Sequence, residues 1–256
     1  MRDGLRRSLY RLHFVLGSLV GLASFLTISL LGIIYALALR NRARNAPLLF
    51  ARGFGLVMRT VLGWRILVQE DEFVLGSSPA LYMATHQSNL DIVTYGSIFP
   101  RGTVAVGKKE ILRIPLFGWF FKVTGNILLD RQNRQSAVRS IAAAAERIKS
   151  EGLSVWMFPE GHRNLTPTLL PFKKGAFHLA IAGQVPIVPI VSEPIAVILD
   201  AHRGLVRPGT MRVRVLAPIP TAGLGPEDVD RLLDEVHAAM QRARDELASS
   251  SSEPIG

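Results

Sequence analysis

Cysteine is absent from this chain, and its absence removes several kinds of chemistry at once. Without thiols there is no disulfide framework and no thiolate metal site. An enzyme of this sequence also cannot use a cysteine as its nucleophile. The 256 residues are enough for one large core, or for one core with an appendage.

Three common catalytic signatures are missing as well. The chain has no Gly-x-Ser-x-Gly turn, which argues against a serine hydrolase. It has no His-Glu-x-x-His pair, and its other histidines lack the spacing of metal ligands. Residues Gly102–Lys108 approach a P-loop, but Lys109 stands where a serine or threonine should hold magnesium. We therefore expect no metal and no cofactor.

Acidic residues are nearly absent from the first 65 residues, which hold ten arginines and one aspartate. This segment carries +9 of the total net charge of +10, and the remaining chain is almost neutral. A nucleic-acid-binding domain would carry its basic residues on the folded domain itself. We therefore expect no nucleic-acid partner, and we assign the charge to the N-terminal segment.

That segment also contains a long apolar run. The 26 residues Phe14–Leu39 include no charged side chain. A straight helix of that length would measure about 39 Å, more than a bilayer core of about 30 Å. The run is too long for the apolar part of a signal peptide. Arginines beside such a run favour contact with anionic lipid headgroups, so we expect membrane lipids as partners.

Arginines stand on both sides of the run, and basic flanks prefer the cytoplasmic side. This favours a hairpin dipping into one leaflet over a single span, which stays as the alternative. Several small residues offer places to turn: Ser18, Gly21, Ser24, Thr27, Ser29 and Gly32. A further amphipathic helix at Leu48–Leu62 is expected to lie along the interface. Residues 1–62 are thus predicted to form a membrane anchor.

From residue 63 onward, short apolar strands alternate with helices, which predicts an α/β catalytic domain over residues 63–248. The expected strands are Ile66–Val68, Leu81–Ala84, Thr103–Val106, Ile127–Leu129, Leu153–Phe158, Ile187–Val191 and Met211–Leu216, the last an edge or half-exposed strand. Helices are expected at Ser136–Lys149 and from Pro226. Prolines in Val185–Ile190 suggest a sheet edge or a strand start. The serine-rich tail at 249–256 is expected to be disordered.

The residues most informative about function lie at Thr85–Asp91, where His86 and Asp91 stand five positions apart. A histidine held by a carboxylate is a general base at neutral pH. Ser88–Asp91 also matches a capping box, so Asp91 belongs in the first turn of a helix. Residues five apart on one helix point about 140° away from each other. His86 must therefore lie on the loop before the helix, with Asp91 reaching back.

A second short motif is Phe158–Arg163. Arg163 follows a turn at Gly161, where glycine permits tight backbone geometry. From there its guanidinium can bind a phosphate or carboxylate through two parallel hydrogen bonds. A base for an alcohol and a clamp for an anion together indicate acyl transfer onto a hydroxyl of a phosphorylated molecule.

Four motifs occur in one order: His-x4-Asp, then Gly125–Arg131, then Phe158–Arg163, then Val185–Ile190. This series resembles the glycerolipid acyltransferases, most of all their bacterial lysophosphatidic acid acyltransferases, and covers roughly residues 80–192. Lys108–Ile111 and Pro115–Trp119 also look like a segment of that family. The departures are Thr85 where the family usually has asparagine, and His162 and Asn164 where it usually has threonine and serine.

The resemblance implies a mixed central sheet flanked by helices, and an enzyme of the bacterial cytoplasmic membrane. In this family pattern His86 takes the proton of an acceptor hydroxyl that attacks a thioester, and Asp91 orients the ring. The donor would be acyl-CoA or acyl carrier protein, and the acceptor a lysophospholipid. Arg163, Arg131 and Lys108 would bind the acceptor phosphate.

Other interpretations stay open. Glu160 either touches the acceptor's glycerol hydroxyls or braces Arg163. The acceptor is lysophosphatidic acid, another lysolipid or glycerol 3-phosphate. Lys173 and Lys174 are candidates to face the donor phosphates. A thioesterase or lipase would use water in place of the alcohol, and a catalytically silent membrane-binding module would turn over nothing.

Overall fold

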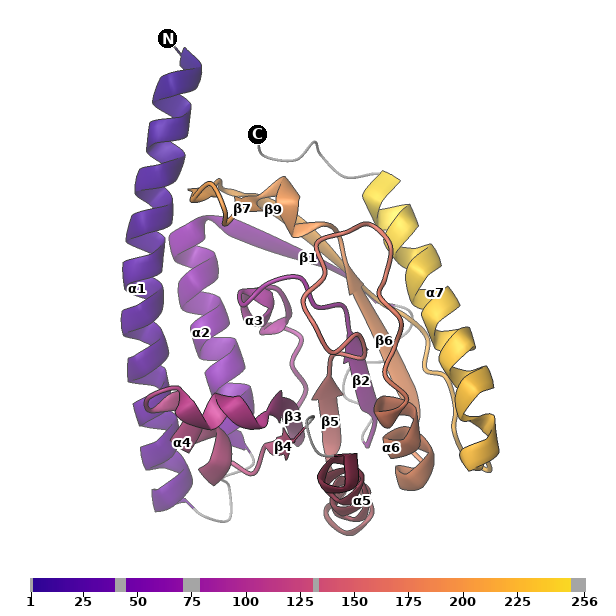
Figure 1. Cartoon of the computed structure of the whole chain (residues 1–256). Coiled ribbons are helices and arrows are strands. Elements are labelled where there is room, and N and C mark those ends of the chain that lie inside the picture. Colours follow the sequence, from indigo (N-terminus) through magenta and orange to yellow (C-terminus); the bar gives the residue numbers. More distant parts are fainter. Residues whose placement is uncertain (1, 40–44, 71–78, 131–133, 250–256) are drawn as a thin grey trace.

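The computed structural model describes residues 2–39, 45–70, 79–130 and 134–249. Its centre is one seven-stranded sheet with helices on both faces (Figure 1). The strand order is β1-β9-β6-β2-β5-β3-β4. All neighbouring strands pair in parallel except β6 and β9, which are antiparallel. The predicted α/β fold with a mixed central sheet is therefore confirmed.

The strands of this sheet are β1 (Trp64–Glu70), β2 (Leu81–Ala84), β3 (Thr103–Lys108), β4 (Ile127–Leu129), β5 (Ser154–Met157), β6 (Ile187–Ser192) and β9 (Gly209–Val215). A separate two-stranded sheet pairs β7 (Leu199–Asp200) with β8 (Leu205–Val206). The helices are α1 (Arg2–Ala38), α2 (Ala46–Leu62), α3 (Asp91–Tyr95), α4 (Phe117–Val123), α5 (Arg134–Glu151), α6 (Gly175–Gly183) and α7 (Val229–Ser249). Short 3-10 turns are η2 (Lys109–Arg113), η3 (Ile195–Val197) and η4 (Pro226–Asp228).

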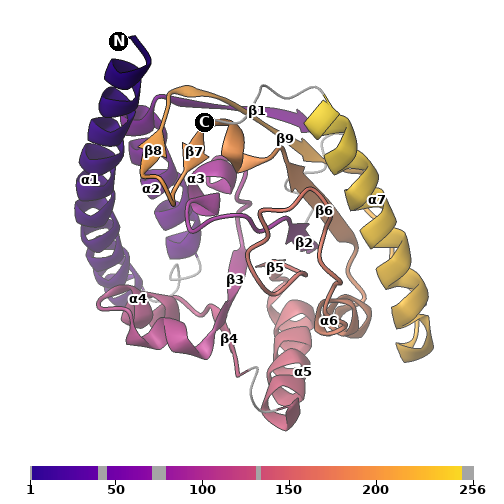
Figure 2. The same ribbon diagram turned by 45° about the horizontal axis from the view of Figure 1, so that its top comes forward.

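The two faces of the sheet are covered by different helices, because successive strand residues point to opposite sides. Leu81 and Met83 of β2 join the cluster formed with α5, α6 and α7. Tyr82 and Ala84 of the same strand face α2 and α3. Figure 2 shows α5–α7 on one side of the sheet and α1 outside α2 on the other. Every residue of β2 is buried, as expected for a central strand between two layers.

The apolar run forms a single continuous helix, α1, of 37 residues. The hairpin turn that we favoured inside the run is therefore a wrong prediction. A reversal does occur, but between α1 and α2: a side chain at Gly17 would meet Leu62, whereas one at Gly53 would meet Ile28. The physical reason is that α1 finds its partner outside itself, since its small residues let α2 pack closely.

The apolar face of helix α2 packs against the protein and is not free to contact lipid. Phe50, Phe54, Met58 and Leu62 are buried in a cluster shared with α1, α4 and β1. By length and composition, α1 is the only helix of the described residues that could cross a membrane. The anchoring role of residues 1–62 stays a prediction, and the expected disorder of 249–256 falls almost entirely outside the described residues.

Strand β6 is internal to the sheet, so the edge position suggested by its prolines is wrong, although Pro186 does stand just before the strand. Pro189 is tolerated because it lies just before Ile190, the first β6 residue paired with β9, so its missing N–H removes no bond of that ladder. Its carbonyl oxygen still accepts a bond from Leu216 (2.9 Å). Strand β9 is half-exposed as expected, but β1 covers its outer side.

Candidate active site

The two short motifs meet because their strands are neighbours. Strand β2 runs parallel to β5, so both reach the same edge of the sheet at their carboxyl ends. β2 leads into the loop that carries His86, and β5 leads into the loop Phe158–Arg163. In open α/β sheets ligand sites lie at this edge. The sheet therefore brings together residues that are more than 70 positions apart.

The carboxylate of Asp91 is the centre of the site. Its Oδ2 lies 2.6 Å from Nδ1 of His86 and accepts the N–H of Gln87 at 2.7 Å. Its Oδ1 accepts the N–H of Ser88 at 3.0 Å. Asp91 is the first residue of α3, and His86 lies on the loop before it. Asp91 therefore lies in the first turn of α3 and contacts His86, as expected, but the N-cap residue of α3 is Leu90 and it has no side-chain cap bond.

The surroundings of Asp91 determine where the proton lies in the His86–Asp91 pair. Burial raises the pKa of Asp91 above its usual range, while His86 and the two backbone N–H groups act in the opposite direction. Each oxygen of Asp91 accepts a backbone N–H, from Gln87 and from Ser88, which favours the ionised carboxylate. His86 must then carry its proton on Nδ1, so Nε2 is the ring nitrogen able to accept one.

Packing also holds the His86 ring. The ring stacks on Phe158, with centroids 4.1 Å apart and planes 11° apart. Behind it, the buried Thr85 hydroxyl lies 2.7 Å from Tyr95 Oη, which also bonds to Ser192 (3.0 Å). Burial and the negative charge of Asp91 raise the pKa of Tyr95, so its phenol stays neutral. Thr85, one departure from the family pattern, therefore belongs to an internal network behind the histidine.

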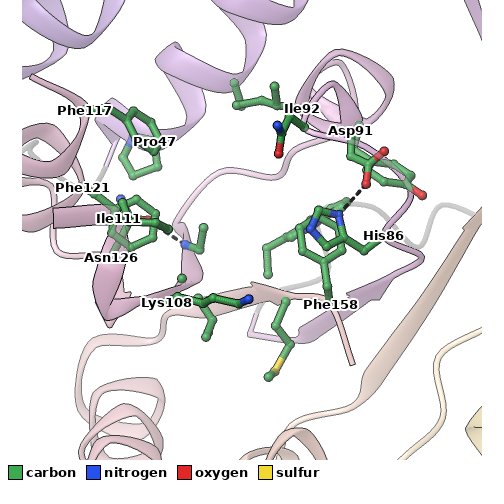
Figure 3. A pocket seen from close by; sticks show the side chains of 18 of the residues that line it. Pro47, His86, Asp91, Ile92, Lys108, Ile111, Phe117, Phe121, Asn126 and Phe158 are labelled. Carbon is green, nitrogen blue, oxygen red and sulfur yellow. Dashed lines mark hydrogen bonds and ion pairs between the residues drawn. The ribbon is translucent and has the colours of Figure 1, made fainter. Parts of the chain in front are cut away.

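A cavity of about 690 Å³ opens beside the dyad (Figure 3). His86 and Asp91 lie at one end of it, and Phe117, Phe121 and Pro47 at the other. Most of its wall is apolar: Phe25, Phe50, Ile92, Phe99, Val106, Ile111, Ile114, Phe120, Trp156, Met157 and Phe158. The cavity can therefore hold a long apolar group with one end at His86.

Two cationic residues line the same cavity, Lys108 and Arg163. Among the described residues, no ion pair ties Arg163 to Glu160, so the guanidinium is available to a ligand. Arg131 lies outside the described residues. Lys174 lies away from the cavity wall and pairs with Asp230 at 2.6 Å.

Glu160 lies beneath the site, and its proposed contact with the acceptor stays a prediction. Its side chain is 1% exposed and does not line the cavity. The carboxylate accepts bonds from Asn164 Nδ2 (2.8 Å), from the Leu170 N–H (3.0 Å) and from the His86 N–H (3.4 Å). Glu160 therefore braces the backbone of the histidine loop. Gly161 has φ +77°, which confirms the expected tight turn.

Asn164, another departure from the family pattern, completes this brace. Its backbone N–H donates to the carbonyl oxygen of His86 (2.7 Å), and its Nδ2 also donates to the carbonyl oxygen of Thr168 (2.8 Å). Its Oδ1 accepts from the Thr166 N–H (2.9 Å). The backbone of Asn164 therefore joins the two loops of the site, whereas its side chain holds its own loop together between Glu160 and Thr168.

A buried arginine, Arg244, was missed by the sequence reasoning. It stands on α7, is 1% exposed, and donates Nη2 to the carbonyl oxygen of Thr166 (2.6 Å). Its Nε and Nη1 have no partner among the described residues. Burial lowers the pKa of Arg244, and Glu160 opposes this most strongly. Its position four residues after Met240, on the apolar face of the last helix, was the available signal.

We expect Glu160→Gln to lower the free energy of unfolding by roughly 2–4 kcal/mol, because an amide cannot accept at both positions and leaves a buried cation uncompensated. Arg244→Met removes that cation. The double variant should lose less than the sum of the two single losses, which denaturant unfolding of the four purified proteins in detergent measures. Additive losses would mean that the charges do not interact, and a rise in acceptor KM at unchanged stability would restore the ligand role of Glu160.

Comparison with known proteins places this site among acyltransferases. Residues 65–193 match the family model described as Acyltransferase. The 1-acyl-sn-glycerol-3-phosphate acyltransferase of Haemophilus influenzae is 37% identical over 220 residues, which are 86% of this chain and 90% of that protein. The protein of the same name from Saccharomyces cerevisiae is 38% identical over 202 residues, 78% of this chain but 66% of the yeast protein.

A solved structure shares the whole architecture. The crystal structure of the 1-acyl-sn-glycerophosphate acyltransferase PlsC from Thermotoga maritima aligns with a TM-score of 0.74 at 25% identity. The alignment covers 99% of this chain and all of that one. It therefore includes α1 and α2 as well as the sheet.

Proposed function

This chain belongs to the acyltransferase family, and we propose from that premise that it transfers an acyl chain to the free sn-2 hydroxyl of lysophosphatidic acid, giving phosphatidic acid. The observation that carries the proposal is the cavity itself. A histidine–carboxylate pair, two cations and a long apolar wall meet in one space of about 690 Å³. The pair can act as a base, the cations can bind a phosphate, and the apolar wall can hold an acyl chain.

In this proposal His86 is the general base. Its Nε2 takes the proton of the acceptor hydroxyl as the oxygen attacks the thioester carbonyl. Asp91 keeps Nδ1 protonated and stabilises the imidazolium that forms. When the carbon–sulfur bond breaks, the imidazolium returns its proton to the leaving thiolate. The new ester bond and the free thiol balance the reaction, and no cofactor takes part.

Different parts of the cavity would bind different parts of the substrates. Arg163 and Lys108 are the groups that would hold the acceptor phosphate, with Arg131 as a third candidate from the sequence. The aromatic end near Phe117 and Phe121 would take the apolar chain. The donor is a thioester of coenzyme A or of acyl carrier protein, since both present the same reacting carbonyl.

Arg163→Ala should act mainly on the phosphorylated acceptor. Loss of a charge-assisted contact costs roughly 1.5–3 kcal/mol, so the acceptor KM should rise about tenfold to a hundredfold. The donor KM should change little. The measurement is steady-state transfer by the purified protein, with each substrate varied in turn and the lipid product identified.

The matched control is Lys149→Ala, which removes an exposed cation of α5 that does not line the cavity. Equal effects of Arg163→Ala on both substrates would argue against an acceptor clamp. Release of free fatty acid without phosphatidic acid from the unaltered protein would favour the hydrolase interpretation.

We further propose that the protein sits in one leaflet of the bacterial cytoplasmic membrane, with its active site on the cytoplasmic side. Packing of α1 supports this placement. Near its N-terminal end His13 Nε2 donates to the carbonyl oxygen of Val61 (2.8 Å), and near its other end Gly32 packs on Phe120. If α1 crossed the bilayer, these partners would have to enter the lipid with it. Both ends of α1 therefore belong on one side.

Cysteines introduced at Ser8 and Asn45 test this sidedness in a chain that has no cysteine of its own. Both positions should react with a thiol reagent only when it is admitted to the cytoplasm, because the helix lies along one leaflet. Reaction of Ser8→Cys from outside intact cells, with Asn45→Cys reacting only from inside, would establish a single span.

A further inference from the structure

The segment 109–123, made of η2 and α4, has two apolar faces. Its inner face contributes Ile111, Phe117, Phe120 and Phe121 to the wall of the cavity. Its outer face exposes four further apolar side chains, here called the 112–119 patch: Leu112, Ile114, Leu116 and Trp119. An apolar surface of this kind usually marks a contact with another molecule or with lipid.

Trp119 is the most informative member of the patch. It is 53% exposed, whereas Trp64 and Trp156, the other two tryptophans, are each 4% exposed. A large indole has an apolar body and one polar N–H, and it is enriched where membrane meets water. Its exposure beside three aliphatic side chains favours an interfacial environment.

The backbone conformation before α4 accounts for the exposure of Leu116. Leu116 has φ +60° and ψ −52°, and the Phe117 N–H donates to the carbonyl oxygen of Pro115 at 2.6 Å. This is a strained γ-turn that a non-glycine residue rarely adopts. A side chain at Gly118 would lie 2.6 Å from the carbonyl oxygen of Leu112, so the backbones of η2 and α4 are in close contact. The turn therefore fixes Leu116 on the outer surface.

Charge on the segment suits an anionic surface. Lys109, Arg113 and Lys122 are exposed around the patch, against one acid, Glu110. Lys109 pairs with Asp130 at 3.3 Å but remains largely exposed. Basic side chains around apolar ones are the arrangement that binds membranes with anionic headgroups.

The patch also continues the exposed surface of α1. A side chain at Gly32 would lie 2.5 Å from the ring of Phe120, so α4 packs directly on α1. Figures 1 and 2 both show α4 crossing the C-terminal half of α1. On that half of α1, Leu30, Leu31 and Ile34 are exposed.

We propose that the 112–119 patch is a second contact with an anionic lipid bilayer, beside α1, and that it turns the mouth of the cavity toward the membrane. Ile114 belongs both to the patch and to the cavity wall, so it marks the rim where a lipid would enter. The identity of that lipid rests on the proposed function, whereas the bilayer contact itself does not.

Tryptophan fluorescence tests the contact directly, because Trp119 is the exposed indole of the three. The full chain is bound to vesicles of phosphatidylglycerol and phosphatidylcholine, with or without bromine on the phosphatidylcholine acyl chains. Brominated lipid should quench the fluorescence of the unaltered protein and should quench Trp119→Phe much less. Equal quenching of the two proteins would overturn the proposal.

Activity provides the second test, with the variant Leu112→Gln/Trp119→Gln, neither of whose positions lines the cavity. Transfer to long-chain lysophosphatidic acid in vesicles should fall about tenfold, because two apolar groups no longer enter the interface. Transfer to a short-chain acceptor dissolved as monomers should stay unchanged. Val138→Gln, at an exposed position of α5, is the matched control and should alter neither rate.

Equal losses with both acceptors would mean a structural defect, and no loss with either would mean no contact; each overturns the proposal. Failure of the proposed function looks different, since the unaltered protein would then acylate neither acceptor while bromine quenching of Trp119 would still be measured.

Discussion

The buried carboxylate of Asp91 is the interaction on which the site depends. A charge that is 4% exposed needs several donors, and this one receives the His86 ring and two backbone N–H groups. The same three bonds close the turn before α3 and fix the proton on Nδ1 of the histidine. The bonds that fold the loop are therefore the same bonds that orient His86, so a change at Asp91 affects both.

A second buried carboxylate, Glu160, holds the same histidine loop from the neighbouring strand of the sheet. It binds the His86 backbone from the loop after β5, and Arg244 supplies a compensating charge from α7. Parallel pairing of β2 and β5 sets the distance between the two loops. His86 is thus held by Asp91 at the start of α3 and by Glu160 and Phe158 after β5, and Phe158 stacks on one face of its ring.

Local patterns in the sequence predicted the local structure well. The spacing of His86 and Asp91 required a loop followed by a helix, and α3 begins at Asp91 as expected. Long-range structure was less predictable. Pro189 indicated an edge strand because the sequence cannot show that its missing N–H falls beyond the end of the β9 ladder. The hairpin in α1 failed, and the bond from Glu160 to the His86 backbone was missed, for the same reason: the partners become neighbours only in the folded chain.

The most direct test of the account is acyl transfer by a folded His86→Ala protein. The matched control is His178→Ala, which removes an exposed histidine of α6 that does not line the cavity. Removal of a general base should lower transfer to lysophosphatidic acid by about 10²–10⁴-fold, while the control keeps the full rate. Thermal unfolding in detergent shows that both proteins are folded. Full transfer activity in folded His86→Ala protein would contradict the central claim that this histidine, held by Asp91, is the base.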